Sequence, residues 1–327
     1  MTPESNIIQI KNFLQKKKDE DIEKKILTDL SGSSKKISSM FFYDEKGSKL
    51  FEKITQLPEY YLTRTEIPLI KQAAQKIGEQ LTDFDIVEFG SGDCSKISLI
   101  LQHIPQQKLD SVRYIPIDIS STAITQSADL LLQQFPDITI QGIVADFMTQ
   151  LHLIPHTKTT VFCFLGSTIG NFSMKEAVQF LNNIRDHMDE DDFLLVGFDM
   201  QKNKTILEKA YNDTQQITQS FNKNILNVIN TQIGTDFDTE DFTHVAFYNE
   251  RFSRIEMHLK ATQDIQISCP LLSSAITLNK DETIHTENSY KFSTDQIEQL
   301  AKETELFINH CYTDDQQWFS LVEFKKR

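Results

Sequence analysis

Cysteine, tryptophan and glycine are scarce in this sequence. Its 327 residues include four cysteines, one tryptophan and ten glycines. The cysteines, at positions 94, 163, 269 and 311, lie far apart and form no Cys-x-x-Cys pair or other metal-ligand spacing. This distribution excludes a disulfide framework and does not support a zinc site. We therefore expect reduced cysteines and no bound metal.

Long apolar segments and an excess of positive charge are also absent. No run approaches the roughly 18 apolar residues that a membrane helix needs, and the charged N-terminal segment lacks the apolar core of a signal peptide. The 33 basic and 47 acidic residues give a net charge of −14, which disfavours binding to nucleic acid or to anionic membranes. We expect a cytoplasmic, monomeric protein without either partner.

Strand-like and helix-like segments alternate between residues 64 and 200. The predicted strands are 85–89, 114–119, 138–147, 159–165 and 192–200, and the predicted helices are 64–81, 95–104, 121–135 and 173–188. The strands are almost continuously apolar, as in sheets that are buried on both faces. This order is typical of an α/β fold with a doubly wound parallel sheet.

The pattern changes after residue 200. Residues 254–262 alternate between apolar and polar side chains, which indicates an antiparallel strand with one solvated face. Later segments continue in this style around one helix, so we expect an α+β unit. Residues 1–30 are predicted to be helical and to pack with it. The expected domains are 66–200, and 1–65 together with 201–327.

The stretch VEFGSGDCSK (87–96) places Gly90 and Gly92 in the loop after the first strand of the alternating region. Such a loop lies at the carboxyl edge of a parallel sheet, where ligands bind. It is not a phosphate-binding P-loop, because no Gly-Lys-Ser/Thr follows. Lys96 occupies the third glycine position of a dinucleotide fingerprint. The alternative interpretation of the loop is a tight strand-to-helix turn without a ligand.

Acidic residues at the ends of the next two strands favour a ligand site at this edge of the sheet. Asp118 ends the second strand, where a carboxylate can accept hydrogen bonds from ribose hydroxyls, and Asp146 with Phe147 ends the third, where they can flank an adenine. This order is the layout of S-adenosylmethionine sites in Rossmann-like methyltransferases. A nicotinamide enzyme usually lacks the third element. Lys96 either pairs with the cofactor carboxylate or is an ordinary surface lysine.

The segment FLGSTIGNF (164–172) follows the fourth strand. Gly166 and Gly170 would keep the backbone close to a ligand. The amide oxygen of Asn171 can accept a hydrogen bond from an amine without adding charge. The structural alternative is a turn that an asparagine caps.

Several motifs together resemble a known family. FFYDEKGSKLFEKITQLPEYYLTRTE (41–66), VEFGSGDCSK, YIPIDIS, ADF, FLGSTIGN, RIEM and TENSYKF occur in this order. They resemble the histidine-specific Nα-methyltransferases of ergothioneine biosynthesis, which trimethylate L-histidine to hercynine with S-adenosylmethionine. The resemblance extends from about residue 35 to the end of the chain. It implies a Rossmann-like class I methyltransferase domain and a second α+β substrate-binding domain.

The resemblance also implies roles for individual residues. On the cofactor side it points to Gly90, Lys96, Asp118, Asp146 and Phe147. On the substrate side it points to Tyr43, Tyr60, Gly166, Asn171, Tyr211, Met257, Glu287 and Ser289. Asn171 and Tyr43 would orient the reacting amine and pass its proton to water, and are the expected catalytic residues.

Glu287 and Ser289 would bind the imidazole. They are two residues apart on a predicted strand, so both point to the same face. Without the resemblance they would be read as a polar outer face, and Met257 as a core residue. Asn288 lies between them where an apolar residue is expected. By alternation it faces away, so we expect little effect on specificity.

Three other functions remain open on the sequence. The same chemistry could act on another amine, such as tryptophan or a derivative, although an indole gives no reason for a carboxylate and a hydroxyl at two ring nitrogens. A non-catalytic S-adenosylmethionine-binding regulator would not need Tyr60, Asn171 and Tyr211 to bind a zwitterion. A nicotinamide-dependent oxidoreductase is disfavoured by Asp146 and by Lys96 at the third glycine position.

Overall fold

The computed structural model describes residues 8–14, 19–92, 94–272 and 275–327. The chain divides into two compact units. Unit 1 contains the described parts of Met1–Gln15, Leu62–Gln201 and Phe292–Arg327. Unit 2 contains the described parts of Lys16–Tyr61 and Lys202–Lys291.

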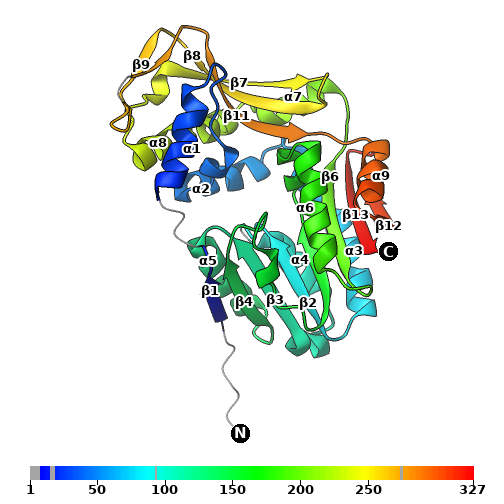
Figure 1. Cartoon of the computed structure of the whole chain (residues 1–327). Coiled ribbons are helices and arrows are strands. Elements are labelled where there is room, and N and C mark those ends of the chain that lie inside the picture. The colour runs from blue at the N-terminus through cyan, green and yellow to red at the C-terminus, as the bar shows by residue number, and fades with distance from the viewer. Residues whose placement is uncertain (1–7, 15–18, 93, 273–274) are drawn as a thin grey trace. The chain divides into compact units, whose positions relative to one another are not determined.

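The centre of unit 1 is one mostly parallel sheet (Figure 1). Its strands are β1 (Ile8–Asn12), β2 (Phe84–Phe89), β3 (Val112–Asp118), β4 (Thr139–Val144), β5 (Thr159–Phe164), β6 (Phe193–Asp199), β12 (Leu306–Thr313) and β13 (Phe319–Lys326). They lie in the order β1-β4-β3-β2-β5-β6-β13-β12. Only β13 runs against its neighbours β6 and β12. The predicted α/β fold is confirmed.

Helices cover both faces of this sheet, as its apolar strands require. The apolar faces of α3 (Tyr61–Gln80), α4 (Ser95–Gln102) and α5 (Ser121–Gln134) share one core with inward residues of the central strands. On the opposite face, Phe180 of α6 (Met174–His187) packs against the rings of Phe89 and Phe164. Unit 1 also contains α9 (Thr294–Glu303) and the short 3-10 helices η2 (Gln106–Ser111), η3 (Leu151–Leu153) and η4 (Thr168–Asn171).

Side-chain caps fix where two of these helices begin. The Ser120 hydroxyl accepts a hydrogen bond from the Ala123 amide at the start of α5. At the start of α6, Ser173 and Glu176 form a capping box, in which each side chain accepts from the other's backbone amide. Each bond satisfies an amide that the first helical turn leaves without a partner.

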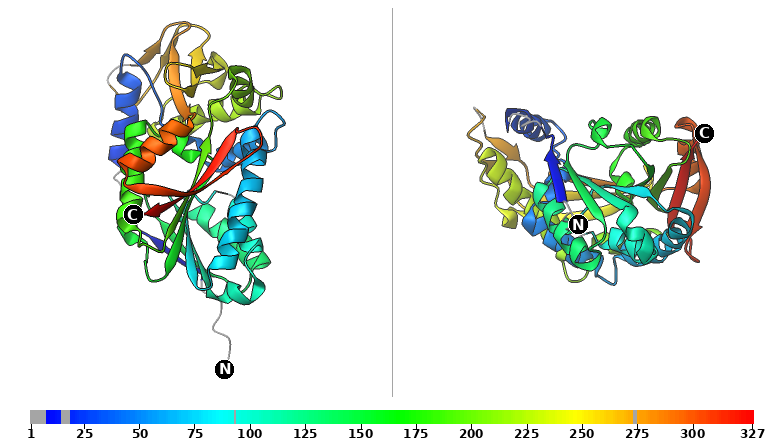
Figure 2. Two further views of the ribbon diagram at one scale, coloured as in Figure 1. Left: turned by 90° about the vertical axis from the view of Figure 1, so that its right-hand side faces the viewer. Right: turned by 90° about the horizontal axis from the view of Figure 1, so that it is seen from below.

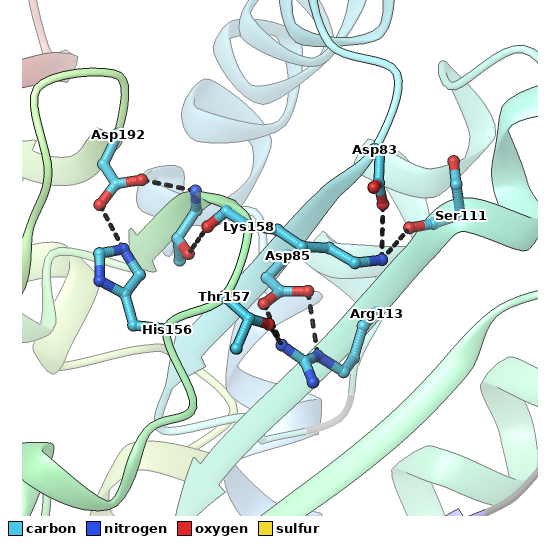
Figure 3. A network of polar contacts seen from close by, with 9 residues as sticks. Asp83, Asp85, Ser111, Arg113, His156, Thr157, Lys158 and Asp192 are labelled. Atoms are coloured by element: carbon cyan, nitrogen blue, oxygen red, sulfur yellow. Dashed lines mark hydrogen bonds and ion pairs between the residues drawn. The ribbon is translucent and has the colours of Figure 1, made fainter.

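A polar network occupies the amino ends of the parallel strands (Figure 3). Asp85 of β2 is fully buried and pairs with Arg113 of β3. Lys158, just before β5, pairs with Asp83 at 2.6 Å. Asp192, just before β6, accepts from the Thr160 amide at 2.6 Å and contacts His156 at 2.7 Å. These bonds tie the loops at this edge together, whereas the glycine loop lies at the opposite, carboxyl edge.

Unit 2 combines helices with a small antiparallel sheet. Its helices are α1 (Asp19–Ser31), α2 (Glu45–Thr55), α7 (Lys204–Tyr211) and α8 (Ile217–Ile233), with the 3-10 helices η1 (Ser39–Phe42) and η5 (Thr239–Asp241). The strands β7 (Phe242–Asn249), β8 (Arg254–Ala261) and β11 (Thr283–Tyr290) pair in the order β11-β8-β7. The strands β9 (Ile265–Ile267) and β10 (Ile276–Leu278) form a separate hairpin. The predicted antiparallel strand at 254–262 is confirmed.

The predicted domain boundary at the C-terminus is wrong. Residues 292–327 belong to unit 1, because β13 pairs with β6 along its length and β12 pairs with β13 (Figure 2). Unit 2 is therefore an insertion after β6, combined with a segment near the N-terminus. Sequence periodicity identified the antiparallel strands but could not show which sheet they complete.

The N-terminal prediction is also partly wrong. Residues 8–12 form β1, which pairs in parallel with β4 of unit 1, whereas the sequence was expected to be helical there. The alternation of Ile8 and Ile10 with polar residues suits an edge strand with one buried face. Residues 19–31 are helical, as predicted. Residues 1–7 and 15–18 of the predicted helical region lie outside the described residues.

Two further expectations concern cysteine and membranes. All four cysteines are free thiols, and Cys94 in the glycine loop is buried. Among the helices of the described residues, none combines the length and the apolar character needed to cross a membrane.

Candidate active site

The glycine loop lies at the switch point of the unit 1 sheet. The strand β2 is flanked by β3 and β5, so the connections after β2 and β5 diverge there, and ligands of such sheets bind at the carboxyl edge. Gly90 and Gly92 have φ values of +74° and +48°, which residues with a side chain rarely adopt. A Cβ built on Gly90 would meet no atom within 4 Å. Open space therefore lies beside the backbone at this position.

Asp118 lies beside this loop. The Gly90 amide donates to the Ile117 carbonyl at 2.9 Å, which joins the glycine loop to the end of β3. The Asp118 carboxylate accepts from the Ser120 amide at 2.8 Å. Burial raises the pKa of Asp118, while nearby backbone amides oppose that shift. The carboxylate is thus fixed at the strand end where the sequence predicted a ribose ligand.

Asp146 and Phe147 follow β4 at the same edge. The Ala145 amide donates to the Asp118 carbonyl at 3.0 Å, so the third loop is tied to the second. The Asp146 carboxylate accepts from the Met148 amide at 2.9 Å. Phe147 packs its ring against Phe89 at 6.0 Å between centroids. The structure therefore brings the predicted glycine loop and both acids to one edge, and these residues fit an adenosine-containing cofactor.

Lys96 lies in the first turn of α4, and its charge has a protein partner. Its Nζ is 2.9 Å from Oε2 of Glu66, which is 1% exposed. The other oxygen of Glu66 accepts from the Gly166 amide at 2.6 Å. A Cβ on Gly166 would lie 2.6 Å from Lys96 Nζ. Glu66 therefore joins Lys96 to Gly166, the two residues that the sequence assigned to the cofactor and the substrate.

Asn171 ends the 3-10 helix η4, which follows β5. Ser167 before it adopts a left-handed conformation with φ +57°, and its hydroxyl accepts from the Asp199 amide at 2.8 Å. These contacts fix the course of the loop between β5 and α6. The Asn171 side chain is half-buried and forms no hydrogen bond with other described residues. Its amide is available to a ligand.

In unit 2, the FFYD motif anchors Tyr43 between two helices. Asp44 caps α2 by accepting from the Gly47 amide at 2.7 Å, and it also accepts from Asn224 of α8 at 2.8 Å. A Cβ on Gly47 would lie 1.7 Å from the Phe42 carbonyl oxygen, so only glycine allows this approach. Tyr43 is 44% exposed. Its ring contacts Phe51 and Phe221 edge-on.

Tyr60 and Tyr211 are neighbours in unit 2. Their rings meet edge-on at 6.3 Å between centroids, and both residues are buried. Tyr60 also contacts the ring of Phe51, the aromatic neighbour of Tyr43. The three tyrosines that the resemblance assigned to the substrate are thus linked through aromatic contacts.

A β-bulge sets the faces of β11. His285 lies opposite His258 of β8, but Glu287 lies opposite Met257, so Thr286 is the extra residue. The bulge places His285 and Glu287 on opposite faces, although they are two residues apart. Glu287 and Ser289 share the face of Met257, as predicted. Asn288 faces away, opposite Glu256, and its side-chain oxygen is 2.9 Å from His285 Nε2.

Glu287 carries a carboxylate that has no hydrogen-bond partner among the described residues. Its side chain forms no hydrogen bond or ion pair with other described residues, yet burial raises its pKa to about 7 against the opposing charge of Lys291. The side chain keeps some accessible surface although protein atoms surround it densely. A group in this setting lacks the partners that buried charges normally have. It is therefore a strong candidate for contact with a ligand.

Lys291 is a buried lysine that the sequence reasoning missed. It is 1% exposed, and its Nζ lies 2.8 Å from Ser289 Oγ and 3.1 Å from Tyr211 Oη. The two oxygens are themselves 2.8 Å apart. The sequence contained a signal for Lys291, because Glu287, Ser289 and Lys291 occupy alternate positions of TENSYKF and would share one face of an extended strand. Glu66 was missed as well, although it lies in the quoted TRTE motif.

A second polar cluster occupies the other face of the sheet in unit 2. Ligand atoms of Glu256, His258 and His285 lie within 4.8 Å of one another, and burial lowers the pKa of both histidines. Arg254, however, contacts Glu256 Oε1 at 2.7 Å and 2.8 Å through two nitrogens. A divalent cation would face this guanidinium charge. We therefore interpret the cluster as a salt-bridge network.

Comparison with known proteins finds relatives whose names describe methyltransferases. A family described as "Histidine-specific methyltransferase, SAM-dependent" matches residues 22–326. A histidine N-alpha-methyltransferase of Mycolicibacterium smegmatis is 33% identical over 302 residues, covering 92% of this chain and 94% of that protein. A 4-dimethylallyltryptophan N-methyltransferase of Arthroderma benhamiae is 26% identical over 309 residues, covering 89% of each.

Among solved structures, a magnesium protoporphyrin IX methyltransferase from Synechocystis with bound SAH aligns with a TM-score of 0.47 and 9% identity. The alignment covers 88% of this chain and 97% of that chain. The family match and the 33% identity extend over nearly the whole chain. On this evidence the protein belongs to the histidine-specific, S-adenosylmethionine-dependent methyltransferases.

Proposed function

We propose that the protein transfers methyl groups from S-adenosylmethionine to the α-amine of L-histidine, three times in succession, to give hercynine. Family membership supports the reaction type, and the relative named histidine N-alpha-methyltransferase supports the substrate. The observation that carries the proposal to this chain is Glu287, a densely surrounded carboxylate that forms no hydrogen bond or ion pair with other described residues.

In unit 1, the proposed cofactor residues are Gly90, Lys96, Asp118, Asp146 and Phe147. When bound, the cofactor supplies a methyl group on a sulfonium. The bare backbone at Gly90 allows close approach, Asp118 would accept from the ribose, and Asp146 with Phe147 would hold the adenine. Lys96 would bind the cofactor carboxylate, with Glu66 holding the ammonium in place.

In unit 2, Glu287 and Ser289 would bind the two nitrogens of the imidazole, and Met257 would flank the ring. The phenols of Tyr43 and Tyr60 suit the charged ends of an amino acid, because they donate hydrogen bonds without adding charge. Tyr211, whose O–H donates to Ser289 Oγ, would contribute to substrate binding through that contact. In our proposal Gly166 and Asn171 contact the α-amine.

The reacting amine must be neutral, since methyl transfer is an in-line displacement that uses the nitrogen lone pair. The α-amino group at the end of a peptide has an ordinary pKa of about 7.7–8.0, and the pKa of a free amino acid is higher because its carboxylate is ionised, so only a small fraction of the amine is neutral near pH 7. Asn171 would orient this amine by accepting one of its protons in a hydrogen bond, and Tyr43 would assist loss of the proton to water. Positioning is the main contribution that such a site makes.

A second substrate class is favoured by one comparison. The relative from Arthroderma benhamiae carries a name that describes methylation of a tryptophan derivative. An indole has one N–H donor and no ring-nitrogen acceptor, so it could use Glu287 but would leave the Ser289 hydroxyl without a partner. Histidine satisfies both groups, and we therefore prefer it.

The cellular setting and assembly state are part of the same proposal. Four free thiols fit a reducing compartment such as the cytoplasm. We propose that the protein acts as a monomer on a small amino acid. Size-exclusion chromatography with light scattering would test this, and a stable dimer would contradict it.

The function is tested by offering the purified protein S-adenosylmethionine with each of the twenty amino acids and measuring product masses. We expect a gain of three methyl groups on histidine alone. Methylation of tryptophan instead would overturn the substrate assignment while keeping the reaction. Cofactor binding without methylation of any amino acid would favour a different amine or a non-catalytic regulator.

A further inference from the structure

Lys291, Ser289 and Tyr211 form a closed triangle of hydrogen bonds in unit 2. Lys291 Nζ is 2.8 Å from Ser289 Oγ and 3.1 Å from Tyr211 Oη, and these two oxygens are 2.8 Å apart. All three residues are buried. Each member therefore has its hydrogen-bonding role constrained by the other two.

The ammonium group fixes the direction of these bonds. It has N–H donors and no acceptor, so both hydroxyl oxygens must accept from it. Between the hydroxyls, the phenol of Tyr211 is the stronger acid and the better donor, so it donates to Ser289 Oγ. Both lone pairs of the Ser289 oxygen are then occupied. Its own O–H must point elsewhere, as a donor.

Glu287 supplies the complementary group on the same face of the sheet. Above its pKa of about 7, Glu287 is ionised and only accepts hydrogen bonds, and it has no hydrogen-bond partner among the described residues. The strand therefore presents one obligatory acceptor and one obligatory donor, separated by a single residue. A neutral imidazole has one N–H and one ring lone pair, which is the matching combination.

We propose that Lys291 is a positioning residue that makes Ser289 an obligatory hydrogen-bond donor, so that Glu287 and Ser289 together recognise one neutral tautomer of an imidazole side chain. This inference rests on the proposed function. An imidazolium would direct an N–H at the Ser289 O–H, and an indole would leave that O–H unpaired. Buried polar groups left unpaired in this way are what give such sites strong selectivity.

A measurement on the unaltered protein tests the hydrogen-bond directions. L-histidine labelled with 15N in its ring is bound to the protein together with S-adenosylhomocysteine at pH 7.5, and the ring-nitrogen chemical shifts are recorded. We expect one protonated and one unprotonated nitrogen, in a single tautomer. Two protonated nitrogens would overturn the inference while leaving the proposed function intact. Absence of histidine binding would overturn both.

A double-mutant cycle tests whether Lys291 acts through Ser289. Lys291→Met removes the donors and keeps the length of the side chain, and we expect it to raise the KM for histidine at least tenfold, with a smaller change in kcat. In the Ser289→Ala background the same change should raise KM less than threefold, because the hydroxyl it orients is gone. Equal effects in both backgrounds would contradict the inference and indicate a structural role.

Two controls complete this experiment. Lys260→Met removes a lysine from the opposite face of the same sheet, where it pairs with Asp281, and should leave KM unchanged. Lys291→Gln keeps N–H donors without the charge, and its KM should stay closer to that of the wild type than the KM of Lys291→Met. A KM for Lys291→Gln as high as that for Lys291→Met would show that charge, and not hydrogen-bond direction, matters. Binding of S-adenosylhomocysteine should be the same in every variant.

Discussion

The carboxylate of Glu66 joins Lys96 to Gly166: one oxygen lies 2.9 Å from the lysine ammonium, and the other accepts from the glycine amide at 2.6 Å. These contacts link α3, the start of α4 and the loop after β5 within unit 1. Glu66 therefore fixes two residues that our proposal places beside the cofactor and the substrate.

Glu66→Ala should destabilise unit 1. It leaves the Gly166 amide and the Lys96 ammonium without their partner, and such losses cost about 2–3 kcal/mol. Urea denaturation followed by circular dichroism measures this change. Glu66→Gln is the matched control, since its amide oxygen can still accept from Gly166, and it should cost about 1 kcal/mol. Equal losses in both variants would argue that the charge on Glu66 supplies all of its effect.

Gly90→Ala should lower both the stability of the protein and its affinity for the cofactor, for two different physical reasons. The φ of +74° penalises alanine by roughly 1–2 kcal/mol, while the added methyl group meets no protein atom within 4 Å. If the open space holds the cofactor, the dissociation constant of S-adenosylhomocysteine should rise more than about tenfold. Gly32→Ala is the control, because Gly32 lacks a positive φ and has ordinary contacts. Unchanged affinity in Gly90→Ala would remove Gly90 from the proposed cofactor site.

Asn171→Ala should lower kcat/KM for histidine by about a hundredfold, the loss that misplacement of a reacting group can cause. Its side chain forms no bond with other described residues, so stability should hardly change. Calorimetry should show the same affinity for S-adenosylhomocysteine. Turnover equal to that of the wild type would exclude the proposed role in orienting the amine.

Glu287→Gln should make the protein more stable at alkaline pH. The folded-state pKa of about 7 lies above the ordinary value of 4.5, so between these values the folded protein holds a proton that the unfolded chain has lost. The cost of the carboxylate therefore grows as pH rises through this window, to about 3 kcal/mol at most. The stability difference between variant and wild type should be near zero at pH 4 and largest above pH 7.

The wild type and Glu287→Gln differ only in this carboxyl group. The pH dependence of the difference between their stabilities therefore reports the titration of Glu287 alone. Lys291 is the charge that acts on it, and its charge lowers the pKa. A pH-independent stability difference would show that Glu287 has an ordinary pKa. The KM for histidine should rise in Glu287→Gln at every pH where the wild type carries the carboxylate.

Between residues 64 and 200, local sequence determined the secondary structure of unit 1 and the edge of the sheet that carries the candidate site. Apolar strands alternating with amphipathic helices specify a parallel sheet, and residues at successive strand ends must then meet at one edge. Gly90, Asp118 and Asp146 were therefore predictable. Ser173 and Glu176 likewise fixed the start of α6, because a capping box depends only on residues three apart.

Only the tertiary structure decided the relationships that depend on distant pairing. Periodicity could not show that β13 completes the sheet beside β6, because an antiparallel strand looks the same in either sheet. The bulge at Thr286, which turns His285 away from Glu287, adds a residue without a sequence signature. Glu66 contacts Lys96 and Gly166, which lie 30 and 100 residues later in the chain. Lys291 contacts Tyr211, which lies 80 residues before it. Burial of the charges of Glu66 and Lys291 depends on contacts that exist only once the chain has folded.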